Sequence, residues 1–238
     1  MGIIGTRVTR GPDGPSVGRP GSPVAVASVI GRLEGGATWD EAGRSLGLGP
    51  ADLVAAVAAD ALGPDDGHGP PLAQAMPRHP ALRAALSDPA LAAATGLKAA
   101  RPARLALAAG LLQVQDFWDA SHAAAQEAED LGERDVSAYW HGIAHRREPD
   151  AGNAAYWFRR VGRHPIFRPL AAAARPILEA EGAHATRIGR SETWEPSALI
   201  ELAGRARPGT SEETVARRLQ RLEMLLLLEA TAEAAGLG

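Results

Sequence analysis

The sequence has no cysteine, a single lysine (Lys98) and only ten aromatic residues among its 238 positions. The lack of cysteine excludes disulfides, thiolate metal ligands and a cysteine nucleophile. No apolar run reaches the roughly 18 residues needed to cross a membrane, and the first residues lack the apolar core of a signal peptide. We therefore expect a cytoplasmic protein that does not enter a membrane.

An excess of either charge is also missing. Lysine and arginine together number 25 against 28 aspartates and glutamates, which leaves a net charge of -3. Such a balance provides no overall attraction to nucleic acid or to an anionic membrane. Alanine and arginine are so abundant that they look like a coding bias. Aromatic residues and histidines therefore carry more information about function than they would in an average chain.

Strand patterns are scarce as well. Only residues 3–9 have the pattern of a short β-strand, whereas alanine, leucine, arginine and glutamate recur at helical spacing through the rest of the chain. Proline and glycine interrupt these segments. The sequence thus predicts an all-α fold, with a small three-helix N-terminal domain linked to a larger helical bundle.

The boundaries of these units follow from composition. Residues 1–62 form the N-terminal domain, the Gly/Pro-rich residues 63–71 form a linker, and residues 72–238 form the bundle. Thr38 with Glu41 and Thr210 with Glu213 have the spacing of capping boxes, and Asn153 is a further candidate N-cap. The predicted helices cover residues 24–34, 39–46, 51–62, 103–130, 136–148, 154–161, 169–181, 196–205 and 211–235.

One window is unusual. Eight of the ten aromatic residues and four of the seven histidines lie between Phe117 and Phe167. Five arginines crowd the second half of this window, and Arg168 follows it directly. Large amphipathic side chains with convergent polar groups are typical of a ligand pocket. The alternative is that the window is only the hydrophobic core, although a core alone does not require so many histidines and arginines.

The window contains a candidate metal site. His141 and His145 are one helical turn apart, so both imidazoles could bind one divalent ion such as Zn, Fe or Mn. His122 lies on the preceding helix, which a short connection makes an antiparallel neighbour, and it could supply the third ligand. Each histidine could instead be an ordinary hydrogen-bonded boundary residue.

Three carboxylates are candidates for a catalytic role. Glu148 lies one turn after His145 and could complete the ligand set or act as a base on bound water. Asp119 is three residues before His122 and could bind the ion or orient the histidine. Glu223 lies on an apolar helix face, where a carboxylate needs a cation or a donor. It could meet His141, an arginine or a metal.

A candidate substrate-binding surface follows the histidines. Arginine presents a planar fork that suits carboxylate or phosphate, and an aromatic wall excludes water around it. An anionic or polar ligand is the partner that such a surface fits. The same arginines could instead form a lattice with acidic residues that ties helix ends together. The residues assigned to this surface are Arg147, Asn153, Tyr156, Trp157 and Arg160.

The N-terminal domain contains a set of residues that matches a known pattern: Gly5 to Val8, Leu33 to Gly36, Asp40, Glu41 and Leu48 to Leu53. In these residues it resembles a family of small bacterial antitoxin-like helix-turn-helix domains of unknown function. The resemblance implies binding to DNA or to a protein. The helix predicted for residues 51–62 carries Asp52 and Asp60 and no basic residue, which makes DNA an unfavourable partner and favours docking or dimerisation.

The C-terminal part contains a second set of residues that matches a known pattern: Ser137 to His141, His145 to Glu148, Asp150 and Asn153 to Pro165. In this core it is similar to a group of uncharacterised helical proteins from bacteria and fungi. The similarity implies that the His/Arg/aromatic window is a module, and it assigns no catalytic residue.

Two functions of different class remain. The first is a metal-dependent helical enzyme that activates water for a small anionic or polar substrate. The alternative is a non-catalytic module that binds a small ligand or a protein, as an antitoxin or regulator would. A protein partner or a second copy of the chain is compatible with either.

Overall fold

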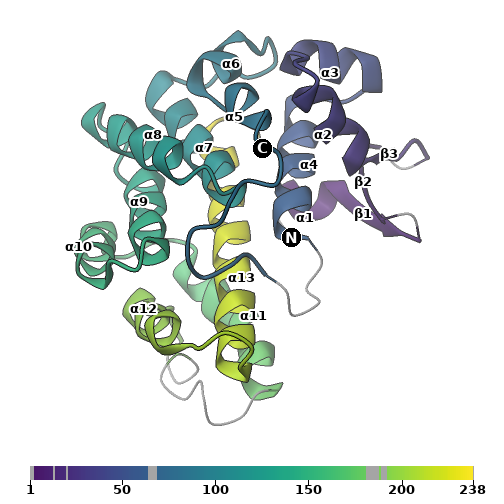
Figure 1. Cartoon of the computed structure of the whole chain (residues 1–238). Coiled ribbons are helices and arrows are strands. Elements are labelled where there is room, and N and C mark those ends of the chain that lie inside the picture. The colour runs from purple at the N-terminus through teal and green to yellow at the C-terminus, as the bar shows by residue number, and fades with distance from the viewer. Residues whose placement is uncertain are drawn as a thin grey trace.

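The computed structural model describes residues 3–12, 14–19, 21–63, 69–180, 188 and 192–237, and within them the chain forms thirteen helices and three short strands. Helices dominate, as the sequence predicts. The purely all-α prediction is wrong in one place, because a small antiparallel sheet lies near the N-terminus (Figure 1).

Most of this sheet lies between the strand predicted for residues 3–9 and the helix predicted for residues 24–34, and its third strand takes the first two residues of that predicted helix. Its strands pair in the order β1-β2-β3, with Val8 opposite Val17. The predicted strand over residues 3–9 is also misplaced, because a helical turn comes first. Gly14 has φ 103°, a backbone conformation that favours glycine and allows the tight β1–β2 turn. The elements are α1 (Ile3–Arg7), β1 (Val8–Gly11), β2 (Gly14–Val17) and β3 (Val24–Ala25).

The three helices predicted for the N-terminal domain are confirmed as α2 (Val26–Glu34), α3 (Trp39–Leu46) and α4 (Pro50–Leu62). The Thr38 hydroxyl accepts from the backbone N–H of Glu41, whose carboxylate accepts from the N–H of Thr38, so the capping box is complete. Most of α4 is buried.

The larger unit begins with two short helices and then forms a layered bundle. Pro176 lies inside α11, and Asp150 rather than Asn153 is the N-cap of α10. Residue 181, the predicted end of α11, lies outside the described residues. The elements are α5 (Leu82–Ala85), α6 (Asp88–Ala93), α7 (Arg101–Val114), α8 (Trp118–Asp130), α9 (Val136–Arg147), α10 (Ala151–Val161), α11 (Phe167–Ala180), α12 (Pro196–Arg205) and α13 (Ser211–Ala234).

The single long helix predicted for residues 103–130 is wrong, because it is divided into α7 and α8. The division is at Asp116, whose φ of 65° is left-handed and therefore cannot continue a right-handed helix. The chain turns back there and α8 packs against α7. The helical pattern of apolar residues continues across the turn, so periodicity alone did not reveal it.

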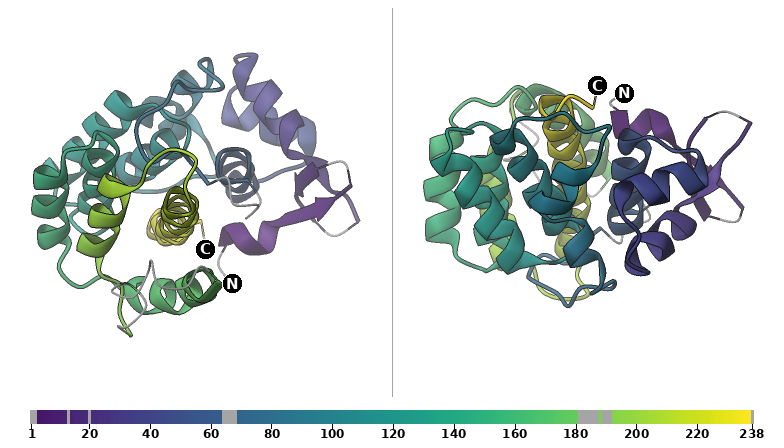
Figure 2. Two further views of the ribbon diagram at one scale, coloured as in Figure 1. Left: turned by 60° about the horizontal axis from the view of Figure 1, so that its bottom comes forward. Right: turned by 90° about the horizontal axis from the view of Figure 1, so that it is seen from above.

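Helix α13 lies at the centre of the molecule. It contacts α7, α11 and α12 of the bundle and also α1 and α4 of the N-terminal part. The left view of Figure 2 looks along α13 and shows the other helices arranged around it. One cluster of buried apolar residues includes side chains from both parts. The division into residues 1–62 and 72–238 stays a prediction, and residues 64–68 of the expected linker lie outside the described part of the chain.

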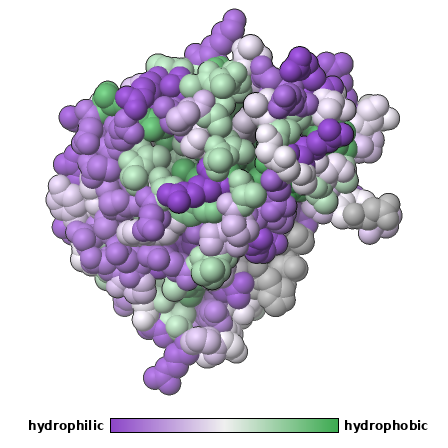
Figure 3. All heavy atoms as spheres, turned by 45° about the horizontal axis from the view of Figure 1, so that its top comes forward, coloured by the Kyte–Doolittle hydropathy of each residue, from purple (hydrophilic) through white to green (hydrophobic). Residues whose placement is uncertain are grey.

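The surface is mixed. On the face drawn in Figure 3, hydrophilic residues alternate with smaller hydrophobic patches. Among the described residues no single helix is long and apolar enough to cross a membrane. Helices α3 and α4 reach the required length and apolar composition only when they are taken together, and the chain bends by 97° between them.

Gly110 is where α7 packs most tightly against its neighbours. A Cβ atom there would lie 2.8 Å from the Trp140 ring and 2.9 Å from a methyl group of Leu228. We expect Gly110→Ala to lower the free energy of unfolding by about 1–3 kcal/mol, because the core must shift to admit the methyl group. Urea denaturation measures this.

Gly31 is the matched control. It is also a helical glycine, and a Cβ there meets nothing within 4 Å. Gly31→Ala should raise the free energy of unfolding by about 0.5–1 kcal/mol, because alanine has the higher helix propensity. Equal effects of the two substitutions would contradict the close approach of Gly110 to Trp140.

Candidate metal centre

The candidate residues come from three consecutive helices. Helix α9 packs between α8 and α10, and Figure 1 shows the three side by side. Every residue of α9 is buried. A Cβ atom at Gly142 would lie 3.1 Å from the Phe158 ring of α10, so even alanine there would require this ring to shift by a few tenths of an ångström.

The three predicted histidines lie together. His122 Nε2 of α8 is 2.8 Å from His141 Nε2 of α9, and one ring nitrogen from each of His122, His141 and His145 lies within 4.8 Å of the others. The His122 ring meets the other two edge-on, whereas the His141 and His145 rings are nearly parallel, with centroids 5.0 Å apart. The cluster is therefore one that could hold a metal ion.

Neighbouring groups fix the orientation of each ring. His145 Nδ1 is 3.0 Å from a carboxylate oxygen of Glu148, which leaves Nε2 of His145 for an ion. Trp157 stacks on His141 at a centroid distance of 3.7 Å. Trp118 stacks on His122 at 5.1 Å and donates its indole N–H to the carbonyl of Ala144, 2.7 Å away.

Burial favours the neutral form of two of the three rings, His141 and His122. Burial lowers the pKa of His141 to about 3, and the adjacent His122 and His145 rings act in the same direction. Burial also lowers the pKa of His122, opposed by the charges of Glu148 and Asp119. Neutral imidazole is the form that binds a metal, so the His141 and His122 rings do not need to lose a proton first.

The three ligand nitrogens lie within 4.8 Å of one another and would have to shift to hold a small divalent ion. With Zn–N distances of about 2.0–2.1 Å and tetrahedral angles, two ligand nitrogens lie about 3.3 Å apart. The His122 and His141 nitrogens are closer, at a hydrogen-bonding distance, and would separate by about half an ångström. His141 Nδ1 is buried and has no hydrogen-bond partner within the described ranges. Three imidazoles without a carboxylate favour Zn or Fe over Mn.

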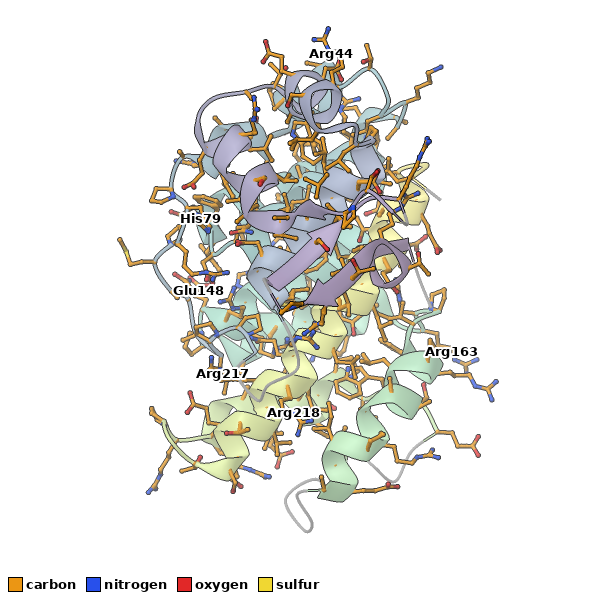
Figure 4. The ribbon with its side chains drawn as sticks, turned by 90° about the vertical axis from the view of Figure 1, so that its right-hand side faces the viewer. Arg44, His79, Glu148, Arg163, Arg217 and Arg218 are labelled. Atoms are coloured by element: carbon orange, nitrogen blue, oxygen red, sulfur yellow. The ribbon has the colours of Figure 1, made fainter. Side chains whose placement is uncertain are left out.

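The three predicted catalytic carboxylates do not share one place. Glu148 ends α9 and is bonded to His145; Figure 4 shows it on the opposite side of the view from Arg163. Asp119 is exposed, and its charge acts on His122. Glu223 is fully buried and is bound by Arg146, Tyr139 and Trp194.

The apolar setting of Glu223 left His141, an arginine or a metal as its possible partner. In the structure the partner is an arginine, Arg146. Arg146 Nη2 is 2.6 Å from Glu223 Oε2, and the Tyr139 hydroxyl donates to Oε1 from 2.9 Å. Burial and the Glu223 charge hold the pKa of Tyr139 well above its usual value, so the hydroxyl keeps its proton. These contacts account for Glu223 without a metal.

Arg147, predicted to bind substrate, is fully buried and has its donors engaged. Its guanidinium forms an ion pair with Asp116 and donates to the backbone carbonyls of Pro71, Ala73 and Gln113. It thereby ties the 71–73 segment and the α7–α8 turn to the end of α9. This matches the alternative of an arginine that links chain segments.

The other four substrate candidates are on α10. Asn153 donates its side-chain amide to Asp150, 2.8 Å away, within the helix cap. Arg160 forms an ion pair with Glu129 and lies over the rings of Trp157 and Tyr156 at 5.3 and 5.8 Å. Trp157 thus joins the half-exposed guanidinium to the His141 ring, while Asn153 and Tyr156 are exposed. Their role towards a substrate stays a prediction.

Two residues of the site were not assigned from sequence. Trp118 covers His122, and the helical face it shares with His122 was the available signal. Arg146 holds Glu223, and the isolated carboxylate on an apolar face was the signal there. No family model, no curated protein and no solved structure matches the chain, so the site rests on its own geometry.

The depressed pKa of His141 predicts a pH-dependent stability in metal-free protein. The unfolded chain takes up a proton below about pH 6.5, whereas folded His141 does so only near pH 3. The unfolded state then binds more protons, so the free energy of unfolding should fall as the pH falls through this window. For one titrating group, the free energy of unfolding changes by at most about 1.4 kcal/mol per pH unit.

Urea denaturation in the presence of EDTA, between about pH 7.5 and 5.5, measures this slope. The His141→Gln variant has no imidazole at this position, and its slope should be smaller. If the variant and the natural protein lose stability in parallel over this range, His141 is not held neutral by the fold.

Proposed function

We propose that this protein is a metal-dependent enzyme whose ion is bound by His122, His141 and His145. The observation that carries the proposal is the convergence of three ring nitrogens within 4.8 Å, two of them in direct contact. Three protein ligands with an open coordination position are typical of catalytic zinc sites, whereas structural zinc sites usually have four.

The open position would hold water. A zinc ion lowers the pKa of bound water to about 7, so hydroxide is available at neutral pH. Asp119 is exposed and electrostatically coupled to His122, which suits it to accept a proton from that water. Glu148 orients His145 by its hydrogen bond and is a positioning residue. Hydrolysis is the reaction class that these groups fit.

The substrate class follows from the rim of the site. Arg160 is half-exposed and lies over Trp157, which in turn stacks on His141. A small polar or anionic substrate would meet this guanidinium next to the ion. Glu129 already balances the charge of Arg160, so an anion would compete with an existing ion pair. This favours a polar or singly charged substrate over a highly charged one.

The N-terminal part is proposed to dock a protein or a second copy of the chain. Helix α4, which would be the recognition helix of a helix-turn-helix unit, is largely buried. Asp52 pairs with Arg7, and Asp60 lies near Arg78 and His79. A buried helix with acidic ends is poorly suited to a DNA groove, which supports a protein partner.

Metal binding is tested on protein purified without a nickel column and stripped with EDTA. We expect one equivalent of Zn²⁺ or Co²⁺ to bind and to raise the melting temperature. His122→Ala and His141→Ala should each weaken Zn²⁺ binding by more than about 100-fold. Substitution of a residue that only hydrogen-bonds to a metal ligand already lowers metal affinity by about 10–100-fold. Competition with a chelating dye measures the affinity.

His164→Gln is the matched control. His164 is also buried, but it packs against Tyr139 and is not part of the cluster. This variant should keep the natural metal affinity. The proposal is wrong if the natural protein takes up none of Zn²⁺, Co²⁺, Fe²⁺ and Mn²⁺, or if the two alanine variants bind as tightly as the control.

Catalysis is tested separately on the zinc-loaded protein with 4-nitrophenyl acetate. The rate should rise through about pH 7, where zinc-bound water ionises. Asp119→Asn should lower kcat by about 100-fold, as expected for loss of a general base. Asp130→Asn, an exposed carboxylate at the other end of α8, should leave it unchanged. If the protein binds the metal but does not hydrolyse the ester, the catalytic part of the proposal is wrong and the metal site is non-catalytic.

A further inference from the structure

Charge is unevenly distributed along the chain. Residues 151–178 contain five arginines and no aspartate or glutamate, although the whole chain has a net charge of -3. This stretch comprises α10, its connection to α11 and most of α11. The near-neutral total therefore conceals a local excess of positive charge, which is typical of a surface that binds an anionic partner.

Three of these arginines are free to bind a partner. Arg163, Arg168 and Arg175 are exposed, and none of them has an ion pair or a hydrogen bond in the described part of the chain. Arg160 differs from them, because it pairs with Glu129. Figure 4 shows Arg163 at the edge of the molecule beside the start of α11. We call Arg163, Arg168 and Arg175 the arginine row.

Helical geometry aligns two members of the row. Arg168 and Arg175 are seven residues apart on α11, which is almost two full turns, so they project from the same side about 10.5 Å apart along the axis. The other side of α11 carries the buried Leu170, Ala174 and Ile177 and packs against α13. The row therefore lies on the face that is turned away from the core.

Neighbouring carboxylates do not neutralise the row. Glu179 is exposed one turn after Arg175 and marks the end of the basic surface. Near the other end, Glu133 accepts from the backbone N–H groups of Val136 and Ser137 at the start of α9. The arginines thus keep their charge available for a partner from outside the chain.

The surroundings of the row favour a partner that is bound by charge alone. The large apolar residues that are exposed in the described part of the chain are Met76, Leu131 and Tyr156, and none of them is on α11. Protein interfaces usually have an apolar or aromatic centre, and a helix that lies in a membrane surface needs an apolar face. The α11 surface offers neither.

The spacing of the row fits a phosphate backbone. Phosphates recur about every 3.4 Å along the axis of one strand of a nucleic-acid helix, so about 10.5 Å spans three of them. The guanidinium group also matches the geometry of a phosphate. A single row of cations matches one strand, whereas a duplex presents two backbones on either side of a groove.

We propose that the arginine row binds the phosphate backbone of single-stranded nucleic acid without preference for base sequence. This surface is separate from α4, whose buried and acidic character makes it unsuited to a DNA groove. It does not depend on an ion at the histidine cluster.

Fluorescence anisotropy with a labelled 20-nucleotide oligothymidylate tests the proposal, in the presence of EDTA. We expect a Kd on the order of 1–10 μM at about 20 mM salt. Three phosphate contacts predict that the logarithm of the association constant falls with the logarithm of the salt concentration with a slope of about −2.

The row variant combines Arg163→Ser, Arg168→Ser and Arg175→Ser. It should bind the strand at least about tenfold more weakly and with a slope near zero, because the phosphate contacts are lost. These side chains are exposed, so the fold should be retained, and circular dichroism measures this.

A control variant removes the same charge elsewhere. It combines substitutions to serine at exposed arginines of α2, α3 and α5, and it should keep the natural affinity within about twofold if the row itself binds the strand. His141→Ala should also keep it, so failure of the metal proposal does not affect this test. The control positions are Arg32, Arg44 and Arg83.

Two further ligands identify the partner. A polyglutamate peptide and vesicles that contain phosphatidylserine should each bind more weakly than the oligothymidylate. The proposal is wrong if the oligothymidylate does not bind at low salt, if the row and control variants bind alike, or if a duplex of the same length, the peptide or the vesicles bind as tightly. Any of these outcomes leaves the metal proposal standing.

Discussion

The structure depends on one constraint, which is that α9 is buried on every side. A buried helix is normally apolar, because each polar group taken from water needs a partner inside the protein. Helix α9 instead carries two histidines, two arginines and a tyrosine among its twelve residues. The surrounding helices are therefore arranged to supply the partners that these side chains require.

The partners differ around the helix. His141 and His145 meet His122 of α8, Arg146 meets Glu223 of α13, and Arg147 meets Asp116 at the α7–α8 turn. The Arg147 guanidinium is held by several acceptors. Among the described residues, buried nitrogens of His141 and Arg146 have no hydrogen-bond partner. An unsatisfied polar group beside a possible ion site is where a ligand contributes most.

Much of the fold was predictable from local signals. The boundaries of α3 follow from Thr38 as an N-cap and from a glycine after its end, and such signals act within a few residues. The α7–α8 turn was not predictable, because the left-handed Asp116 is stabilised by Arg147, thirty-one residues away. The small sheet was missed for a similar reason: its strands are short, and pairing between them rather than intrinsic preference makes them extended.

The sequence by itself determined that three histidines on adjacent helices form a candidate ligand set, because helical spacing and a short connection restrict where they can lie. It also determined that Glu223 needs a cation or a hydrogen-bond donor. Only the tertiary structure decided which partners those are, and that Arg147 and Asn153 are engaged elsewhere. Those outcomes depend on which long side chains meet across the core, and helical periodicity specifies the buried face of a helix but not the neighbour packed against it.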